Sequence, residues 1–424
     1  MNQTAPTAPA SVLDRDDPLA DLRGEFHIPQ HDGREAVYLC GNSLGLQPVA
    51  AAGLLAEELE DWKRLGVEGH FRGRRPWVDY HRQFAAGLGR LTGCAPGEAA
   101  AMNTLTVNLH LLMVSFYRPT TERWRLLIEK PAFPSDRYAA ESQVRFHGLE
   151  PGDALLEIGP REGESWIREE DILRTIDEIG DTIALVLLPG VQYYSGQVFD
   201  MAGITAAARA RGCRVGWDLA HAIGNVPLSL HDWGCDFATW CSYKYLNGGP
   251  GAVSGIFVHA RHAEDSGLPR FAGWWGHDRA SRFEMGPQFR PMPGAEGWQL
   301  SNPPIFSLTP LLASLELFER AGMDALRRKS ERLTGFLEAL LTRRLPDEVR
   351  ILTPPDPSRR GCQLSLALRA GRDRGREVFA GLSAAGVVCD WREPDVIRVA
   401  PVPLYNRYAD CEHFVAVLAD LLGG

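Results

Sequence analysis

Short apolar segments alternate with amphipathic segments along the middle of the chain, from about residue 126 onward. The apolar segments have the length of buried strands. The segments between them repeat apolar residues at helical spacing, with a serine or aspartate near the start or a glycine at the close. This alternation is typical of parallel strands joined by crossover helices, and it predicts an α/β unit. The predicted strands are residues 125–130, 153–158, 182–190, 213–220, 236–243 and 255–260, and the predicted helices are residues 135–148, 168–180 and 200–212.

The pattern changes at residues 301–310, SNPPIFSLTP, where a proline-rich turn precedes a helical stretch from about residue 308 to residue 344. Because 424 residues are too many for one compact core, we expect two domains, of which the second is a smaller α+β unit. Its predicted strands are residues 351–355, 362–368, 387–391 and 395–401, and its predicted helices are residues 376–386 and 411–424. The predicted organisation is an N-terminal segment packing with the small domain (residues 1–43), a large domain (residues 44–306) and a small C-terminal domain (residues 307–424).

Composition and charge narrow the class of function. The chain is 45% hydrophobic and 23% charged, which is ordinary for a globular protein. Its formal net charge of −9 argues against nucleic acid as a partner, because a nucleic-acid surface needs an excess of basic residues. No apolar run of about 18 residues and no signal-peptide pattern occurs, so no membrane partner is expected. The eight cysteines lack CxxC spacing and predict buried free thiols in a reducing cytoplasm, and no metal site is expected.

Two residues that end predicted strands carry the strongest chemical signal. Ligands of open α/β sheets collect where strands end, and Asp218 and Lys244 end two successive strands. A lysine in such a position costs free energy unless its charge is paired or its amine is used in a covalent bond. Pyridoxal phosphate needs such a lysine, and it needs an acid opposite its ring nitrogen, which Asp218 would supply. Taken alone, the two residues are equally consistent with a buried salt bridge between neighbouring strands.

Two further motifs favour the cofactor over the salt bridge. Phe133 and Asp136 lie between a strand and a helix, where the phenyl ring could stack on a cofactor and the carboxylate could contact its polar edge. Leu105 and Thr106 begin another predicted helix, where free backbone N–H groups favour a phosphate. Asp136 and Thr106 are also ordinary helix-capping candidates. No Walker-type or GxGxxG loop occurs, so a nucleotide is not expected.

Other candidates have a structural alternative. Arg398, in an apolar strand of the small domain, suits a bidentate contact to a substrate carboxylate, but an arginine there could also form a domain-interface ion pair. His221 follows a strand and could be functional or be a hydrogen-bonded packing residue. Trp274 and Trp275 could likewise be functional or simply be core aromatics.

A series of motifs, taken in order, resembles that of the kynureninases, which are fold-type-I pyridoxal phosphate enzymes. The motifs are YLCGNSLGLQP, MNTLTVNLHLL, FPSDRYAAESQ, GWDLAHAIGN, LHDWGCDFATWCSYKYLNGGPG, GWWGH, SNPPIF and IRVAPVPLYNRY. The resemblance spans nearly the whole chain, and it implies a large domain with a mainly parallel sheet of the seven-stranded type and a homodimer with sites near the subunit boundary. It also implies hydrolysis of L-kynurenine to anthranilate and L-alanine, or of 3-hydroxy-L-kynurenine to 3-hydroxyanthranilate and L-alanine, in tryptophan breakdown and quinolinate or NAD biosynthesis.

The resemblance further implies roles for individual residues. Lys244 would carry the cofactor and move the α-proton of the substrate, Asp218 would keep the cofactor ring protonated, and Tyr243 would act as a general acid. His70 and Asn302 could hydrogen-bond a ring hydroxyl, which favours acceptance of the 3-hydroxy substrate, or they could merely support the loop. The cofactor-binding residues would be Leu105, Thr106, Phe133, Pro134, Ser135, Asp136, Asp218, His221, Tyr243, Lys244, Trp274 and Asn302, and the substrate-binding residues would be Ser43, His70, Asn302 and Arg398.

Two other classes of function remain open. A cysteine desulfurase or a small aminotransferase would share Asp218 and Lys244, although a desulfurase needs a mobile, exposed cysteine, and none lies in an obvious glycine-rich loop. A noncatalytic scaffold that kept the fold would need neither residue. Pro189 departs from the family pattern, which in some members has a serine or threonine there, so this chain would lack that side-chain contact.

Overall fold

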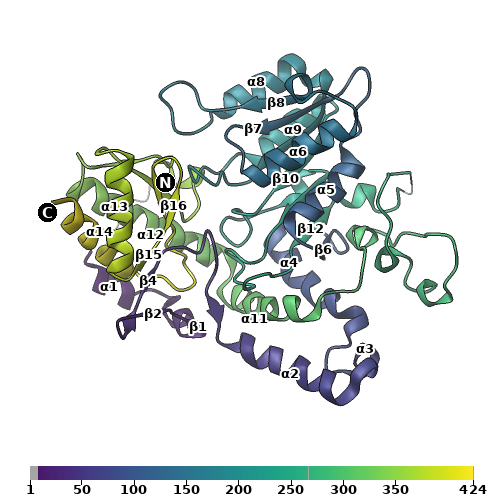
Figure 1. Ribbon diagram of the computed structural model, residues 1–424, viewed down its shortest axis with the longest axis horizontal. Helices are drawn as coiled ribbons and strands as arrows, with labels where there is room; N and C mark the ends of the chain where they lie inside the picture. The colour runs from purple at the N-terminus through teal and green to yellow at the C-terminus, as the bar shows by residue number, and fades with distance from the viewer. Residues whose placement is uncertain (1–7, 266, 424) are drawn as a thin grey trace.

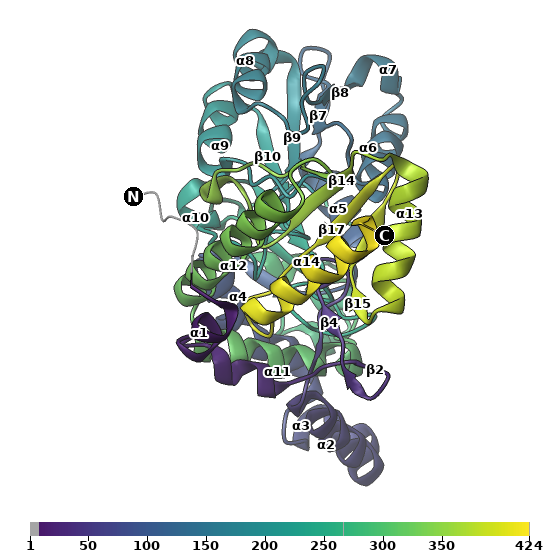
Figure 2. The ribbon, with the colours of Figure 1, turned by 90° about the vertical axis from the view of Figure 1, so that its left-hand side faces the viewer.

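A large lobe built on a central sheet lies beside a smaller lobe (Figure 1). The structure is a computed structural model that describes residues 8–265 and 267–423. The small lobe contains the C-terminal elements together with α1 (Ala10–Arg15), so segments from both ends of the chain lie in it. Two helices, α2 (Ala50–Leu65) and α3 (Gly69–Arg72), lie at the lower end of the molecule in Figure 2, where α2 packs against the helix of residues 305–321.

The central sheet has seven strands in the order β6-β12-β11-β10-β9-β7-β8. The strands from β11 to β8 pair in parallel, whereas β12 runs antiparallel to both of its neighbours, so the sheet is mainly parallel. All six predicted strands are present. The seventh, β6, was not predicted, because three alanines give little strand signal. The strands are β6 (Ala99–Ala101), β7 (Arg125–Glu129), β8 (Leu155–Ile158), β9 (Ile183–Pro189), β10 (Arg214–Asp218), β11 (Phe237–Trp240) and β12 (Gly255–Val258).

Helices cover both faces of this sheet, as crossover connections require. On one face, Leu112 of α5 and Val144 of α6 enter an apolar core with the strands. On the other face, Ile172 of α8 and Ile204 of α9 do the same. The three helices predicted between the strands are therefore confirmed, as is the helix predicted to begin at Leu105. The four helices are α5 (Leu105–Phe116), α6 (Pro134–Phe146), α8 (Glu169–Ile179) and α9 (Met201–Ala210).

The small lobe is built on an antiparallel four-stranded sheet in the order β13-β14-β17-β16, with helices packed on it. Residues 387–391, predicted as one strand, contribute to two strands, because β15 leaves this sheet to pair in parallel with β4 near the N-terminus. The elements are β4 (Val37–Tyr38), β13 (Val349–Ile351), β14 (Leu364–Leu368), β15 (Val387–Val388), β16 (Asp390–Arg392), β17 (Val396–Val399), α12 (Met323–Arg344), α13 (Arg372–Ala384) and α14 (Tyr408–Gly423).

The single helical stretch predicted between the lobes is wrong in one respect. The structure has two helices, α11 (Ile305–Ala321) and α12, which are separated by Gly322 with a φ of 73°. Glycine adopts this left-handed conformation without the steric cost of a side chain, so it interrupts the helix. The buried side chains of α11 join the core of the large lobe, and most of those of α12 join the core of the small lobe. The predicted boundary at residue 306 stays a prediction, and the core packing favours one near Gly322.

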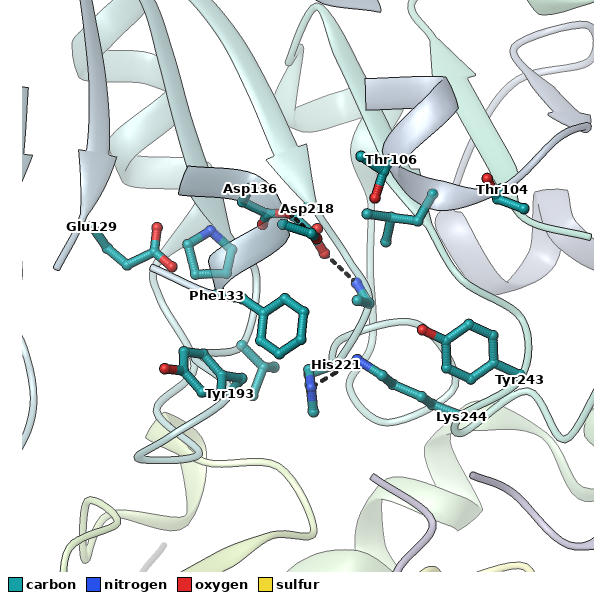
Figure 3. A pocket seen from close by; sticks show the side chains of 15 residues that line it. Thr104, Thr106, Glu129, Phe133, Asp136, Tyr193, Asp218, His221, Tyr243 and Lys244 are labelled. Atoms are coloured by element: carbon teal, nitrogen blue, oxygen red, sulfur yellow. Dashed lines mark hydrogen bonds between the residues drawn. The ribbon is translucent and has the colours of Figure 1, made fainter. Parts of the chain in front are cut away.

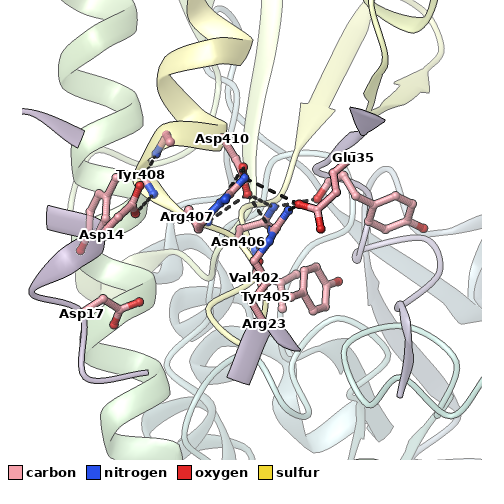
Figure 4. A network of polar contacts seen from close by, with 12 residues as sticks. Asp14, Asp17, Arg23, Glu35, Val402, Tyr405, Asn406, Arg407, Tyr408 and Asp410 are labelled. Atoms are coloured by element: carbon pink, nitrogen blue, oxygen red, sulfur yellow. Dashed lines mark hydrogen bonds and ion pairs between the residues drawn. The ribbon is translucent and has the colours of Figure 1, made fainter. Parts of the chain in front are cut away.

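Polar contacts fasten the N-terminal segment to the small lobe (Figure 4). Asp14 accepts hydrogen bonds from the backbone N–H groups of Tyr408 (2.7 Å) and Ala409 (3.0 Å), and thereby satisfies the first turn of α14. Arg23 lies 3.2 Å from a carboxylate oxygen of Asp410. The predicted segment 1–43 begins with residues 1–7, which lie outside the described residues.

All eight cysteines are free thiols, as predicted. Six are buried, whereas Cys40 and Cys94 are partly exposed, so burial was predicted correctly for most of them. Within the described part of the chain, no helix is both long enough and apolar enough to cross a bilayer.

Candidate active site

The carboxyl ends of the parallel strands and the first turn of α5 enclose one pocket (Figure 3). This is where an open parallel sheet is expected to bind its ligand. Its lining residues are Thr104, Leu105, Thr106, Glu129, Phe133, Ser135, Asp136, Pro189, Val191, Tyr193, Asp218, Ala220, His221, Tyr243 and Lys244. The pocket therefore contains most of the cofactor-binding residues predicted from the sequence.

Lys244 lies in the loop after β11, and its amine points into the pocket. Its Nζ lies 3.0 Å from Nε2 of His221 and 5.7 Å from the centroid of the Phe133 ring. Among the described residues, His221 is the polar partner of this amine, and no ion pair joins Lys244 to Asp218 or to another carboxylate. The salt-bridge alternative is therefore not what the structure shows, and the amine is left available for chemistry.

Asp136 and Asp218 form a buried pair of carboxyl groups that point toward each other. Burial and the nearby charge of Asp218 raise the pKa of Asp136 well above its ordinary value. Burial also raises the pKa of Asp218, but its Oδ1 accepts a 2.6 Å hydrogen bond from the N–H of Ala220, which favours the charged form. The arrangement therefore favours a protonated Asp136 beside a negatively charged Asp218.

His221 contacts the lysine as a neutral imidazole. Its side chain is buried, and burial together with the charge of Lys244 lowers its pKa well below the ordinary value. A neutral ring accepts a hydrogen bond from the lysine amine at Nε2. His221 therefore lines the pocket, and its predicted contact with the cofactor stays a prediction.

The first turn of α5 presents backbone N–H groups to the pocket. Thr104 is the N-cap residue, and Leu105 and Thr106 are the first two helical residues. These N–H groups have no acceptor inside a helix, so together with the helix dipole they form a site for an anion. Thr106 is therefore not the cap, and neither is Asp136, because the N-cap of α6 is Phe133.

These groups fit pyridoxal phosphate. The cofactor needs an amine for its aldehyde, a negative charge opposite its ring nitrogen, a flat surface for its ring and an anion site for its phosphate. Lys244, Asp218, Phe133 and the first turn of α5 offer these four groups around one cavity. The fit rests on an amine without a carboxylate partner and on the N–H groups of a helix end.

Six lining residues were not among the predicted site residues, and two of them, Glu129 and Tyr193, have ionisable side chains. Glu129, the last residue of β7, is buried, and burial with the nearby charge of Asp218 raises its pKa to about 8. Tyr193 lies in the loop after β9. The sequence signal that could have identified Glu129 and Tyr193 is the one that identified Asp218: each is a polar residue at or just after the end of an apolar strand.

Several predicted site residues do not line this pocket. Pro134 and Asn302 are exposed, Ser43 and His70 are partly exposed, and the Trp274 side chain is 44% exposed. Trp274 and His70 nevertheless belong to one cluster of rings, which we call the aromatic patch: His70, Phe71, Phe283 and Trp274. Successive ring centroids in this patch are 6.3, 6.4 and 5.5 Å apart.

Arg398 lies beside the pocket rather than in its lining. Its guanidinium bonds to the carboxylate of Asp390 on the neighbouring strand and donates a 2.7 Å hydrogen bond to the main-chain oxygen of Tyr193. Burial lowers its pKa to about 10. The ion pair is not the predicted domain-interface pair, because Asp390 and Arg398 lie on neighbouring strands of the same small-lobe sheet. Contact of Arg398 with a substrate carboxylate stays a prediction.

Comparison with known proteins identifies the family. Residues 326–418 match the model of the kynureninase C-terminal domain. A kynureninase of Stenotrophomonas maltophilia is 59% identical over 406 residues, with 96% of each chain covered. A kynureninase of Myxococcus xanthus is also 59% identical, with 96% of each chain covered, and one of Xanthomonas euvesicatoria is 58% identical, with 98% of each covered.

Comparison with solved structures identifies the fold. An apo cysteine desulfurase from Thermococcus onnurineus superimposes with a TM-score of 0.75 at 15% identity, covering 99% of this chain and 100% of the other. A complex of the cystine C-S lyase C-DES with cysteine persulfide gives a TM-score of 0.75 at 17% identity, covering 91% and 97%. The predicted α/β fold of the fold-type-I pyridoxal phosphate enzymes is thus confirmed. With relatives this similar over nearly its whole length, the chain belongs to the kynureninase family.

Proposed function

We propose that this protein is a kynureninase, which uses pyridoxal phosphate to hydrolyse L-kynurenine or 3-hydroxy-L-kynurenine to the corresponding anthranilate and L-alanine in tryptophan catabolism. The observation that carries the proposal is the unpaired amine of Lys244 in a pocket that also contains Asp218 and the first turn of α5. The kynureninases that are 58–59% identical support the substrate. A solved structure of C-DES, which has glycine linked covalently to its PLP cofactor, supports the cofactor.

The residues of the pocket can carry the proton transfers of this reaction. When bound, pyridoxal phosphate supplies the electron sink for a bond at the substrate's α-carbon. Nζ of Lys244 removes the α-proton, and Asp218 keeps a negative charge opposite the ring nitrogen. Burial raises the pKa of Tyr243, so its phenol stays protonated and can donate a proton to the β-carbon of the alanine product. Water supplies the hydroxyl of the new anthranilate carboxyl group as the Cβ–Cγ bond breaks.

The test is to purify the protein and follow anthranilate fluorescence after adding L-kynurenine, with 3-hydroxy-L-kynurenine in parallel. Release of either aromatic acid by a yellow protein supports the proposal. If the protein is yellow but releases neither product, Lys244 remains the proposed cofactor lysine, and the proposed function becomes that of a desulfurase or an aminotransferase. A protein that stays colourless with added cofactor contradicts the proposal.

The aryl ring of the substrate is proposed to contact Ser43, His70 and Asn302. A pocket that hydrogen-bonds a substrate hydroxyl discriminates against the substrate without it, because its polar groups are then left unpaired. We expect His70→Phe to lower kcat/KM for 3-hydroxy-L-kynurenine about 10-fold relative to L-kynurenine. Steady-state kinetics with both substrates measure this ratio, and a ratio equal to that of the unmodified enzyme contradicts the role of His70.

We also propose a homodimer in which Trp274 and Asn302 complete the site of the partner. The support is their exposure outside the pocket and the exposure of the aromatic patch, in which Phe71 is 60% and Phe283 is 55% exposed. A contiguous exposed apolar surface of this kind is typical of an interaction site. The helix α3 carries part of it, because His70 and Phe71 lie in α3 (Figure 2).

Subunit complementation tests this arrangement. Lys244→Ala and Asn302→Ala are each expected to be nearly inactive alone. Refolding the two together should restore activity, because a mixed dimer contains one site with both native residues. Activity that stays at the sum of the two single variants would place Asn302 and Lys244 in the site of the same subunit, and size-exclusion chromatography with light scattering checks that dimers form.

The cysteine desulfurase alternative is disfavoured by the thiols. Such an enzyme needs an exposed cysteine of low pKa. Burial raises the pKa of the two partly exposed thiols, Cys40 and Cys94, and the other six are buried. We further propose a cytoplasmic location, which eight free thiols favour, and no nucleic-acid partner, which the formal net charge of −9 favours.

A further inference from the structure

The loop of residues 190–198, between β9 and α9, bonds to both lobes, and we call it the bridging loop. The N–H of Gly190 donates to the main-chain oxygen of Asp218 (2.7 Å). The side chain of Gln192 donates to the main-chain oxygen of Pro131 (2.9 Å). From the small lobe, Thr353 and Ser365 donate their hydroxyl groups to main-chain oxygens of the loop, at 2.6 and 2.5 Å. The proposed mechanism assigns no role to this loop, although two of its residues, Val191 and Tyr193, line the pocket.

Tyr193, in the bridging loop, contacts a residue proposed to bind the cofactor and a residue proposed to bind the substrate. Its ring meets the ring of Phe133 edge to face, with centroids 5.2 Å apart and an interplanar angle of 79° (Figure 3). Its main-chain oxygen accepts a 2.7 Å hydrogen bond from Arg398 and a 3.1 Å hydrogen bond from Gln363. One residue therefore contacts the proposed stacking ring through its side chain and the proposed carboxylate-binding arginine through its backbone.

We infer that Tyr193 is a positioning residue, which holds Phe133 for the cofactor with its ring and Arg398 for the substrate carboxylate with its main-chain oxygen. This inference rests on the proposed function. An edge-to-face contact favours one orientation of the ring that it touches, because the positive edge of one ring faces the negative face of the other. The same contact holds residue 193 beside Phe133, so its loss is expected to loosen the main-chain oxygen to which Arg398 donates.

The first experiment compares Tyr193→Leu, Tyr193→Phe and Tyr194→Leu. Loss of the edge-to-face contact is expected to raise the Kd of pyridoxal phosphate about twofold to tenfold in Tyr193→Leu. KM for L-kynurenine should rise more than kcat falls, since binding and not proton transfer is affected. Tyr193→Phe keeps the aromatic edge and should restore most of both affinities.

Tyr194→Leu is the matched control. Its ring is outside the pocket lining, and its hydroxyl bonds to Asp395 of the small lobe at 3.2 Å. It should leave the Kd of pyridoxal phosphate and KM unchanged. Equal rises in Tyr194→Leu and Tyr193→Leu would mean a general loss of loop stability and would overturn the inference. If Tyr193→Leu does not fold, Tyr193→Met serves the same comparison.

A double-mutant cycle tests whether Tyr193 acts through Phe133. The Kd of pyridoxal phosphate is measured for Phe133→Leu alone and combined with Tyr193→Leu, by titrating cofactor into protein from which it was removed. If Tyr193 acts through that ring, its substitution adds little once Phe133 is gone. Fully additive effects on this Kd would overturn the inference. An unmodified protein that binds the cofactor but does not cleave kynurenine contradicts the proposed function instead, so the two failures can be told apart.

Discussion

Replacing Lys244 with alanine is expected to abolish anthranilate release, with kcat lower by at least about 10²–10⁴-fold. Among the described residues that line the pocket, Lys244 alone carries an amine, so no neighbour can replace it as the group that binds the cofactor and moves the α-proton. The protein should also lose its yellow colour on dialysis. Fluorescence assays of anthranilate and absorption spectra measure the two effects.

Lys130→Ala is the control for this prediction. Lys130 follows β7 directly, but its side chain is exposed and does not line the pocket. Its replacement should leave kcat and colour unchanged. Added methylamine should restore part of the turnover of Lys244→Ala, because a small amine can enter the space left by the side chain and accept the proton. Turnover by Lys244→Ala at the level of Lys130→Ala contradicts the assignment.

Asp218→Asn is expected to lower kcat by about 10²–10³-fold, although the shape of the side chain hardly changes. The asparagine can still accept the hydrogen bond of the Ala220 N–H, but it removes the negative charge that keeps the ring nitrogen protonated. The loss therefore measures the charge and not the packing. Steady-state kinetics, with circular dichroism to check the fold, provide the measurement.

Asp136→Asn makes the matched comparison. Burial and the charge of Asp218 raise the pKa of Asp136 well above its ordinary value, so Asp136 is the member of the pair that holds a proton more readily. An amide then removes less charge here than at Asp218 and mainly alters hydrogen bonds, at a cost of about tenfold or less in kcat. Equal losses in Asp136→Asn and Asp218→Asn would mean that the charge is shared. A larger loss in Asp136→Asn would reverse the assignment.

Much of the fold is readable from the sequence, because buried parallel strands are continuous apolar runs. Residues 182–190 and 213–220, for example, contain β9 and β10 within a residue or two at each end. The reversed direction of β12 was not readable, since an apolar run has the same composition in either direction. Gly322 was visible as a glycine, but one glycine inside a helical pattern does not by itself decide between a break and a tolerated residue.

The sequence predicted those site residues that lie at or just after the end of a single strand. Asp218 ends β10 and Lys244 lies in the loop just after β11, and the structure places them in one pocket. Tyr193 was missed because its role depends on the fold, which brings Phe133 to one side of it and Arg398 to the other. The predicted roles of the residues outside the pocket remain predictions. For Trp274 and Asn302 the proposed role depends on the proposed second subunit, and no pattern within one chain fixes where such a subunit would lie.

The fastening of the N-terminal segment to the small lobe also constrains how the protein is made. Asp14 leaves the ribosome early, whereas the α14 backbone that it caps is synthesised almost 400 positions later, with a sequence separation of 394 between Asp14 and Tyr408. The strand β4 is likewise synthesised long before β15, the strand with which it pairs. All seven strands of the central sheet are synthesised before either partner appears. The small lobe is therefore completed last, by the two ends of a chain whose middle can already have folded.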